Sequence, residues 1–125
     1  MTNYTDLTVD SLKVGTQDIP ALETTQTLID TGDITIKNGV VILNKSSAIA
    51  AALAAPTATT DDFKKLTIIS ITAKAHTVTP STHFGAGGVN TVKSTFGQVI
   101  GNNIQLVAYQ GYWYVVGGQG YTISS

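Results

Sequence analysis

The chain has 125 residues, of which 42% are hydrophobic and only 12% are charged, with a net charge of −1 and no cysteine. One domain of this length buries roughly 65–70% of its unfolded surface, so the composition favours a packed core over disorder. All seven basic residues are lysines and no basic cluster occurs, which argues against nucleic-acid recognition, and the lack of cysteine excludes disulfides and thiolate metal sites.

Residues 1–27 are polar, with apolar residues two positions apart as in short strands. Gly15 and Pro20 interrupt any longer element. We therefore expect an extended N-terminal arm that adds to a sheet of this chain or of a partner, followed by a single β domain over residues 28–125. An unstructured leader is the alternative. The arm residues predicted to contact a partner are Tyr4, Leu7, Val9, Leu12 and Val14.

The next stretch predicts a hairpin. Ile34 and Ile36 alternate with polar residues, Asn38-Gly39 is a preferred pair for a two-residue turn, and residues 40–43 form a continuous apolar return strand. Residues 47–55 are ambiguous, because their alanines favour a helix while Ile49, Ala51 and Leu53 also fit one face of a strand. In a chain otherwise made of strands we favour a strand here.

Further strands are expected at residues 63–72, 75–79 and 91–96, with a polar loop over 80–90. A hairpin rich in aromatic residues then follows over 104–117, turning at Gln110-Gly111, and residues 121–124 form a last short strand. Both faces of this hairpin carry large apolar groups. One face should lie on the core, and the other should meet a second chain or the N-terminal arm; the candidate contact residues are Tyr109, Tyr112 and Tyr114, or else Trp113 and Val115.

Short strands with turn signals about every ten residues predict an all-β fold, a small β-sandwich or barrel with an extended N-terminal arm. No sequence repeat of fixed period is evident. The predicted core comprises Ile34, Ile36, Ile42, Leu66, Ile68, Val78, Leu106 and Val115.

No combination of residues predicts an enzyme. His76 and His83 lack a nearby third ligand for a metal, and Asp61-Asp62, beside two lysines, fit a solvated turn better than a carboxylate pair with Asp33 or Glu23. We therefore expect no catalytic residue, no metal and no cofactor. One binding site stays open as an alternative, a sugar-stacking platform made of Tyr109, Tyr112, Trp113 and Tyr114.

Several segments resemble, in the same order, a module of tailed-bacteriophage virion proteins. The resemblance covers roughly residues 50–116, and the start of the chain is similar to leader segments of such proteins. The hairpin of the module usually turns on Asn-Gly, where this chain has Gln110-Gly111. The matching segments are Leu53-Ala-Ala-Pro-Thr57, Asp61-Asp62, Lys65-Leu-Thr-Ile-Ile-Ser70, Ala73-Lys-Ala-His-Thr-Val-Thr79, Thr95-Phe-Gly97 and Leu106-Val-Ala-Tyr-Gln-Gly-Tyr-Trp-Tyr-Val115.

The resemblance implies a structural protein of the virion, made in the host cytoplasm and without catalytic residues. It favours a capsid decoration (cement) protein that binds and stabilises the phage head as an oligomer. Its expected partners are the major capsid protein and copies of itself, with a homotrimer favoured, and neither nucleic acid nor a membrane. The alternative is a tail- or head-fibre module that recognises a host surface glycan.

Overall fold

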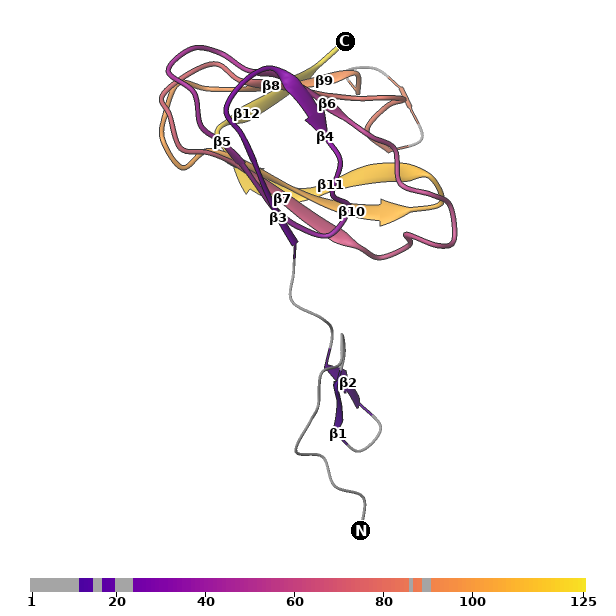
Figure 1. Ribbon diagram of the computed structural model, residues 1–125. Helices are drawn as coiled ribbons and strands as arrows, with labels where there is room; N and C mark the ends of the chain where they lie inside the picture. The colour runs from indigo at the N-terminus through magenta and orange to yellow at the C-terminus, as the bar shows by residue number, and fades with distance from the viewer. Residues whose placement is uncertain (1–11, 15–16, 20–23, 86, 89–90) are drawn as a thin grey trace.

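The computed structural model describes residues 12–14, 17–19, 24–85, 87–88 and 91–125. The described residues form strands without a helix, so the expected all-β fold is confirmed. Two five-stranded sheets pack face to face as a small β-sandwich (Figure 1), and a separate two-stranded sheet precedes them. The two-stranded sheet pairs β1 (Leu12–Val14) with β2 (Gln17–Ile19) in antiparallel orientation.

Sheet I, as we name the first layer, has the strand order β11-β10-β7-β5-β3. Its strands are β3 (Thr24–Leu28), β5 (Gly39–Leu43), β7 (Lys65–Ser70), β10 (Asn103–Tyr109) and β11 (Tyr112–Gln119). Sheet II has the order β12-β9-β8-β6-β4. Its strands are β4 (Gly32–Ile34), β6 (Ala50–Leu53), β8 (Thr77–Pro80), β9 (Lys93–Phe96) and β12 (Tyr121–Ser124).

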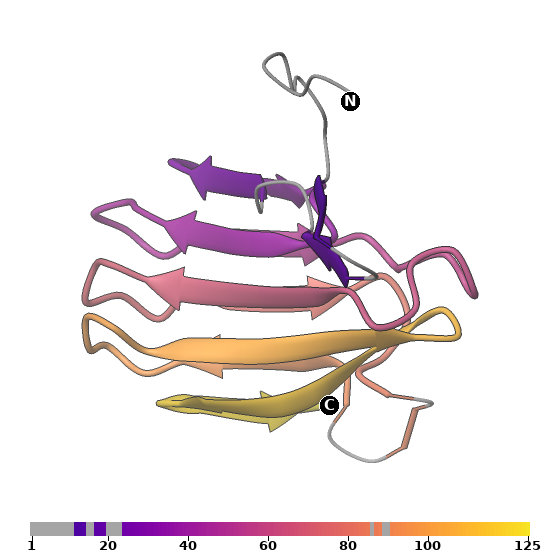
Figure 2. The same cartoon turned by 90° about the horizontal axis from the view of Figure 1, so that it is seen from below.

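From β3 to β8 the chain winds between the two layers, placing each strand in the sheet opposite to that of the strand before it. The strands β3, β5 and β7 are therefore parallel in sheet I, and β4, β6 and β8 are parallel in sheet II. The result is three stacked coils of two strands each, from the indigo end of the body onward in Figure 2. The strands β9 to β12 then close the far end with antiparallel pairs.

This winding contradicts the predicted hairpin at Asn38-Gly39. The strands on either side of that pair, β4 and β5, lie in different sheets and each pairs in parallel with a later strand. Gly39 instead lets the backbone at the start of β5 approach the backbone of Thr24 in β3, at the corner where the chain passes from one layer to the other. A Cβ built on it would lie 1.8 Å from the carbonyl oxygen of Thr24, and its φ of +125° is one that side-chain-bearing residues rarely adopt.

The core lies between the sheets and follows the alternation of the strands. Of the predicted core residues, Ile34, Leu66, Ile68, Val78 and Leu106 are buried, while Ile36 and Val115 pack against the core half-buried. Ile42 was wrongly predicted as core. In the continuous apolar stretch of β5, Val41 and Leu43 are the buried residues, and Ile42 points to the outer face of sheet I. The ambiguous alanine-rich segment forms β6, with Ile49, Ala51 and Leu53 buried as expected for a strand.

Candidate functional site

One end of the sandwich carries a loop, residues 54–64, that is fastened to the turn of the aromatic hairpin. The amide of Phe63 donates to the carbonyl oxygen of Ala108 at 2.7 Å, and the amide of Ala108 donates to the carbonyl oxygen of Lys64 at 2.9 Å. Gln110 (φ 48°) and Gly111 (φ 87°) form the predicted two-residue turn, with both residues left-handed as a type I′ turn requires. We call this loop and turn together the aromatic tip.

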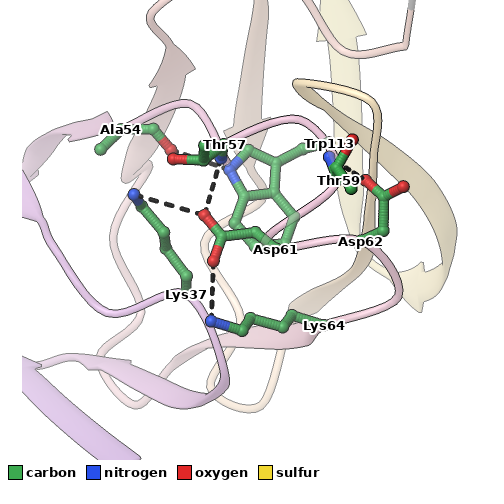
Figure 3. A network of polar contacts seen from close by, with 8 residues as sticks. All are labelled: Lys37, Ala54, Thr57, Thr59, Asp61, Asp62, Lys64 and Trp113. Atoms are coloured by element: carbon green, nitrogen blue, oxygen red, sulfur yellow. Dashed lines mark hydrogen bonds and ion pairs between the residues drawn. The ribbon is translucent and has the colours of Figure 1, made fainter.

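Asp61 fixes the base of the aromatic tip (Figure 3). Its side chain is 5% exposed, and its carboxylate lies 2.7 Å from Lys64 Nζ and 3.5 Å from Lys37 Nζ and accepts a hydrogen bond from the amide of Thr57 at 2.6 Å. The hydrogen bond from Lys64, and next the one from Thr57, lower the pKa of Asp61 to about 2. A buried carboxylate held by two lysines and a backbone amide acts as a structural anchor of the loop.

We expect acid to destabilise the protein through Asp61 because the folded state lowers its pKa from 3.8 to about 2. The stabilisation is fully present above pH 3.8 and is lost as the pH falls toward 2. The shift corresponds to about 2 kcal/mol. Asp61→Asn should therefore lower the free energy of unfolding by about that amount at pH 7. In urea titrations, the variant should show a flatter pH dependence than the wild type between pH 4 and 2; parallel curves for the two proteins would contradict the anchor role.

Asp62 fixes the top of the aromatic tip. It accepts hydrogen bonds from the amide of Gln110 at 2.8 Å, from Gln110 Nε2 at 2.6 Å and from the amide of Thr59 at 3.1 Å. The amide of Gln110 is the main cause of the lowered pKa of Asp62. Thr59 (φ 70°) and Phe63 (φ 68°) both have left-handed backbones, a conformation that costs a residue with a side chain about 1–2 kcal/mol. The carboxylates of Asp61 and Asp62 thus hold a strained loop in one shape.

The side chain that this strained loop presents is Phe63. Its ring is 70% exposed and lies against the ring of Tyr109, which is 46% exposed, with the centroids 5.6 Å apart and the planes tilted by 39°. Burial in the protein's own core does not explain Phe63, because its ring is in solvent. Rigid, exposed aromatic rings are typical contact residues for a partner or a ligand. Phe63 was not singled out in the sequence.

Trp113 does not belong to any exposed platform, and its inclusion in the predicted sugar-stacking site was wrong. The side chain is 1% exposed and its indole Nε1 donates to the carbonyl oxygen of Ala54 at 2.9 Å. Trp113 pairs with Ala108 across β10 and β11, on the inner face of sheet I. It therefore packs in the core beneath the aromatic tip and ties the start of the 54–64 loop to the hairpin.

The three tyrosines predicted to contact another chain lie together on the outer face of sheet I. Tyr109 is opposite Tyr112, and Tyr114 is opposite Val107, whose other neighbour is Lys65. Further along the sheet, beyond the outward-facing Lys65, Thr67 and Gln105, a second group of outward-facing residues is aliphatic. We call the set the tyrosine face: Val40, Ile42, Ile69, Val107, Tyr109, Tyr112 and Tyr114.

The outer face of sheet II is different in chemistry. The outward residues of its strands are small or polar, and sheet II therefore has no counterpart to the tyrosine face. These outward residues are Ala50, Ala52, Thr77, Thr79, Lys93, Thr95, Thr122 and Ser124. A depression of about 280 Å³ lies at the edge of this layer, lined by Asp33, Thr35, Ala52, Leu53, Ala54 and Ser81. Asp33 is the one ionisable residue in that lining, and a lone carboxylate lacks the second acid, base or metal ligand that catalysis requires.

The two histidines have separate local roles. His76 is fully buried; its Nδ1 accepts from the amide of Ile49 at 2.9 Å, which places the proton on Nε2, 2.8 Å from Thr72 Oγ1. Burial lowers the pKa of His76, consistent with a neutral structural ring. His83 is exposed and lies 3.3 Å from Thr91 Oγ1. Within the described part of the chain, no three residues among His, Cys, Asp and Glu are grouped as metal ligands.

Part of the predicted partner site falls outside the described residues. The structure does not describe Tyr4, Leu7, Val9 or Glu23, whereas Leu12 and Val14 are the first and last residues of β1.

No helix among the described residues has the length and hydropathy to cross a bilayer. No family model, curated protein or solved structure matches the chain.

Proposed function

We propose that this protein is a structural component of a tailed-phage virion, a capsid decoration protein that binds and stabilises the head as a homo-oligomer. The tyrosine face is the observation that carries the proposal. Its seven apolar residues lie on four strands, in two groups with Lys65, Thr67 and Gln105 between them, and no carboxylate lies on the same face of these strands. Exposed apolar patches of this kind mark sites of protein–protein contact.

A second copy of the chain is the occupant that the tyrosine face fits best. Across strands about 4.8 Å apart, four strands make a surface roughly 15 Å wide, and five to six residues extend it roughly 20 Å. Lys65 is the charged residue beside this surface, so two copies meet with little like-charge repulsion. The resemblance to phage virion proteins supplies the capsid as further partner and the trimer as the preferred oligomer.

The test places one charge at the centre of the tyrosine face. In Val107→Glu, the new carboxylate has Lys65 on the neighbouring strand as a partner in the free subunit, so the monomer should stay folded. Burial of that carboxylate against another chain should weaken association by at least ~100-fold. Thr95→Glu, on the outer face of sheet II, is the matched control. The readouts are the mass by light scattering and the occupancy on phage heads by electron cryo-microscopy.

Wild-type and Thr95→Glu proteins should assemble and decorate heads, while folded Val107→Glu should do neither. A monomeric wild-type protein, or a Val107→Glu protein that assembles like the wild type, contradicts the proposed contact. Oligomers that fail to bind heads contradict the decoration role and leave the contact between copies in place.

Glycan recognition by a fibre module is a second candidate, which the aromatic tip favours. Phe63 and Tyr109 form an exposed pair of rings, with the amide side chain of Gln110 and the carboxylate of Asp62 beside them. Aromatic faces next to planar polar side chains suit the stacking and hydrogen bonding of a sugar. Phe63→Ala tests this role, because it removes one of the two exposed rings.

A further inference from the structure

Four strands form the outer edges of the two five-stranded sheets: β3 and β11 in sheet I, and β4 and β12 in sheet II. An edge strand exposes a row of backbone N–H and C=O groups that another strand is able to bind. Folded proteins protect such edges with bulges, short strands, charges or a covering segment. In the described part of the chain, three of the four edges are protected and β3 is not.

The edge of β4 is closed by a single side chain. The backbone groups of Ile34 in β4 form hydrogen bonds with β6. The carbonyl of Asp33 and the amide of Thr35 therefore point away from β6, toward the unpaired side of β4. The amide group of Gln26 binds both: its Nε2 donates to the carbonyl oxygen of Asp33 at 2.8 Å, and its Oε1 accepts from the amide of Thr35 at 2.9 Å. The Gln26 side chain thus takes the place of a further strand along β4.

The edges at the other end of the body are protected by irregularity. The amide of Gly85 donates to the outward carbonyl of Trp113 at 2.7 Å, and Phe84 forms a bridge with Trp113, so a loop covers this part of β11. Beyond it, β11 bulges at Val116, because Gln105 pairs with Gly117 while Leu106 pairs with Val115. The edge strand β12 spans four residues, and short edges are poor templates.

The edge of β3 is flat and uncharged. The carbonyl of Leu28 accepts from the amide of Asn44, the residue that follows β5, and in a parallel ladder alternate residues bond to the same neighbour. Gln26 and Leu28 therefore bond to β5, while the backbone groups of Thr25 and Thr27 point outward. The sequence of β3, Thr-Thr-Gln-Thr-Leu, has no lysine, proline or glycine to discourage pairing.

We propose that the open edge of β3 is a strand-acceptor site whose occupant is the β1–β2 hairpin of a second copy of this chain. The inference deepens the proposed assembly role and rests on it, but it uses a surface other than the tyrosine face. A two-stranded hairpin is at best marginally stable alone, and β1 and β2 form a sheet of their own, outside both five-stranded sheets. Addition to β3 gives that hairpin a third strand.

A neighbouring copy is the preferred donor because, among the described residues, the chain's own hairpin leaves this edge unpaired: β1 and β2 pair with each other alone, and the strand order of sheet I ends at β3. Exchange of identical segments between copies also produces closed, symmetric oligomers. The binding mode is strand addition, in which main-chain hydrogen bonds hold the added segment.

Single proline substitutions test the acceptor edge in the full-length chain. Proline lacks the amide hydrogen, and at position 25 or 27 that hydrogen points away from β5, so Thr25→Pro and Thr27→Pro should fold. Each should weaken association about tenfold, as measured by sedimentation. Thr27→Val, which keeps the amide and removes the hydroxyl, is the matched control and should assemble like the wild type.

Hydrogen exchange on the wild type gives a second readout that does not depend on the variants. The amides of Thr25 and Thr27 should be protected at least tenfold more in the assembled protein than in the dilute monomer, while the amide of Leu28 should be protected in both. Equal exchange of Thr25 and Thr27 in both states overturns the proposal. Strong protection already in the monomer also overturns it, because the chain's own hairpin then occupies the edge.

The Val107→Glu variant separates this proposal from the proposed function. If Val107→Glu dissociates the oligomer and the proline variants assemble normally, the strand-acceptor site is wrong and the contact through the tyrosine face stands. If the proline variants dissociate and Val107→Glu assembles, the contact through the tyrosine face is wrong and the acceptor edge stands.

Discussion

Trp113→Ala should lower the free energy of unfolding by about 3–5 kcal/mol, enough to unfold much of the protein. The side chain is the largest fully buried one among the described residues. Its removal opens a cavity beneath the aromatic tip and leaves the carbonyl of Ala54 without its 2.9 Å hydrogen bond. The measurement is a urea unfolding curve followed by far-UV circular dichroism.

Two variants act as controls for Trp113→Ala. Trp113→Phe keeps most of the volume and loses the indole donor, so it should cost about 1–3 kcal/mol. Phe63→Ala removes an aromatic ring that is 70% exposed and should change the free energy of unfolding by no more than about 0.5 kcal/mol. A stable Trp113→Ala protein would contradict the core role assigned to this residue.

Phe63→Ala also decides the glycan alternative. If the wild type binds a sugar on a glycan array and Phe63→Ala, still folded, does not, then the aromatic tip is a recognition site. If neither protein binds any glycan, the fibre-module alternative has no support from this surface.

Gly39→Ala should destabilise the protein by about 3 kcal/mol or more, although it adds a single methyl group. That methyl would lie 1.8 Å from the carbonyl oxygen of Thr24, a backbone atom that cannot rotate away, and the φ of +125° disfavours any side chain. Relief of the clash requires β3 to separate from β5. The first coil should therefore open, which hydrogen exchange at Gln26 and Leu28 should detect.

Gly32→Ala is the matched control for Gly39→Ala. Gly32 lies in β4 of the same coil, and a Cβ built there has open space within 4 Å. Because alanine reduces the freedom of the unfolded chain, this substitution should be neutral or stabilise slightly. Equal destabilisation by the two substitutions would show that the close approach of Gly39 to Thr24 is not the cause.

The strands were predictable from the sequence because their alternation reflects burial on one face. The terminal hairpin, the strand at residues 50–53 and most of the core follow from that pattern. The pattern failed in β5, where four consecutive apolar residues in a parallel strand carry no alternation. Ile42 was accordingly assigned to the wrong face.

The path of the chain was not predictable, because it depends on contacts between distant residues. Asn38-Gly39 has the same local preference at a hairpin turn and at a corner between layers, and only the approach to Thr24 distinguishes the two. The aromatic tip is similar: it requires Asp62 to meet Gln110, 48 positions later. The three tyrosines were found because their alternation with Trp113 is local, whereas Phe63 and Gln26 gave no local signal.

The winding of β3 to β8 also bears on how such a chain lengthens in evolution. Each coil rests on its neighbours along the stack, and the edge groups of the last parallel strands are satisfied by the antiparallel strands that follow. An insertion of one complete coil would therefore leave both ends of the body unchanged. The distance between the β3 edge and the β11 edge would grow by one strand spacing, so a relative of different length could keep both contact surfaces and set them farther apart.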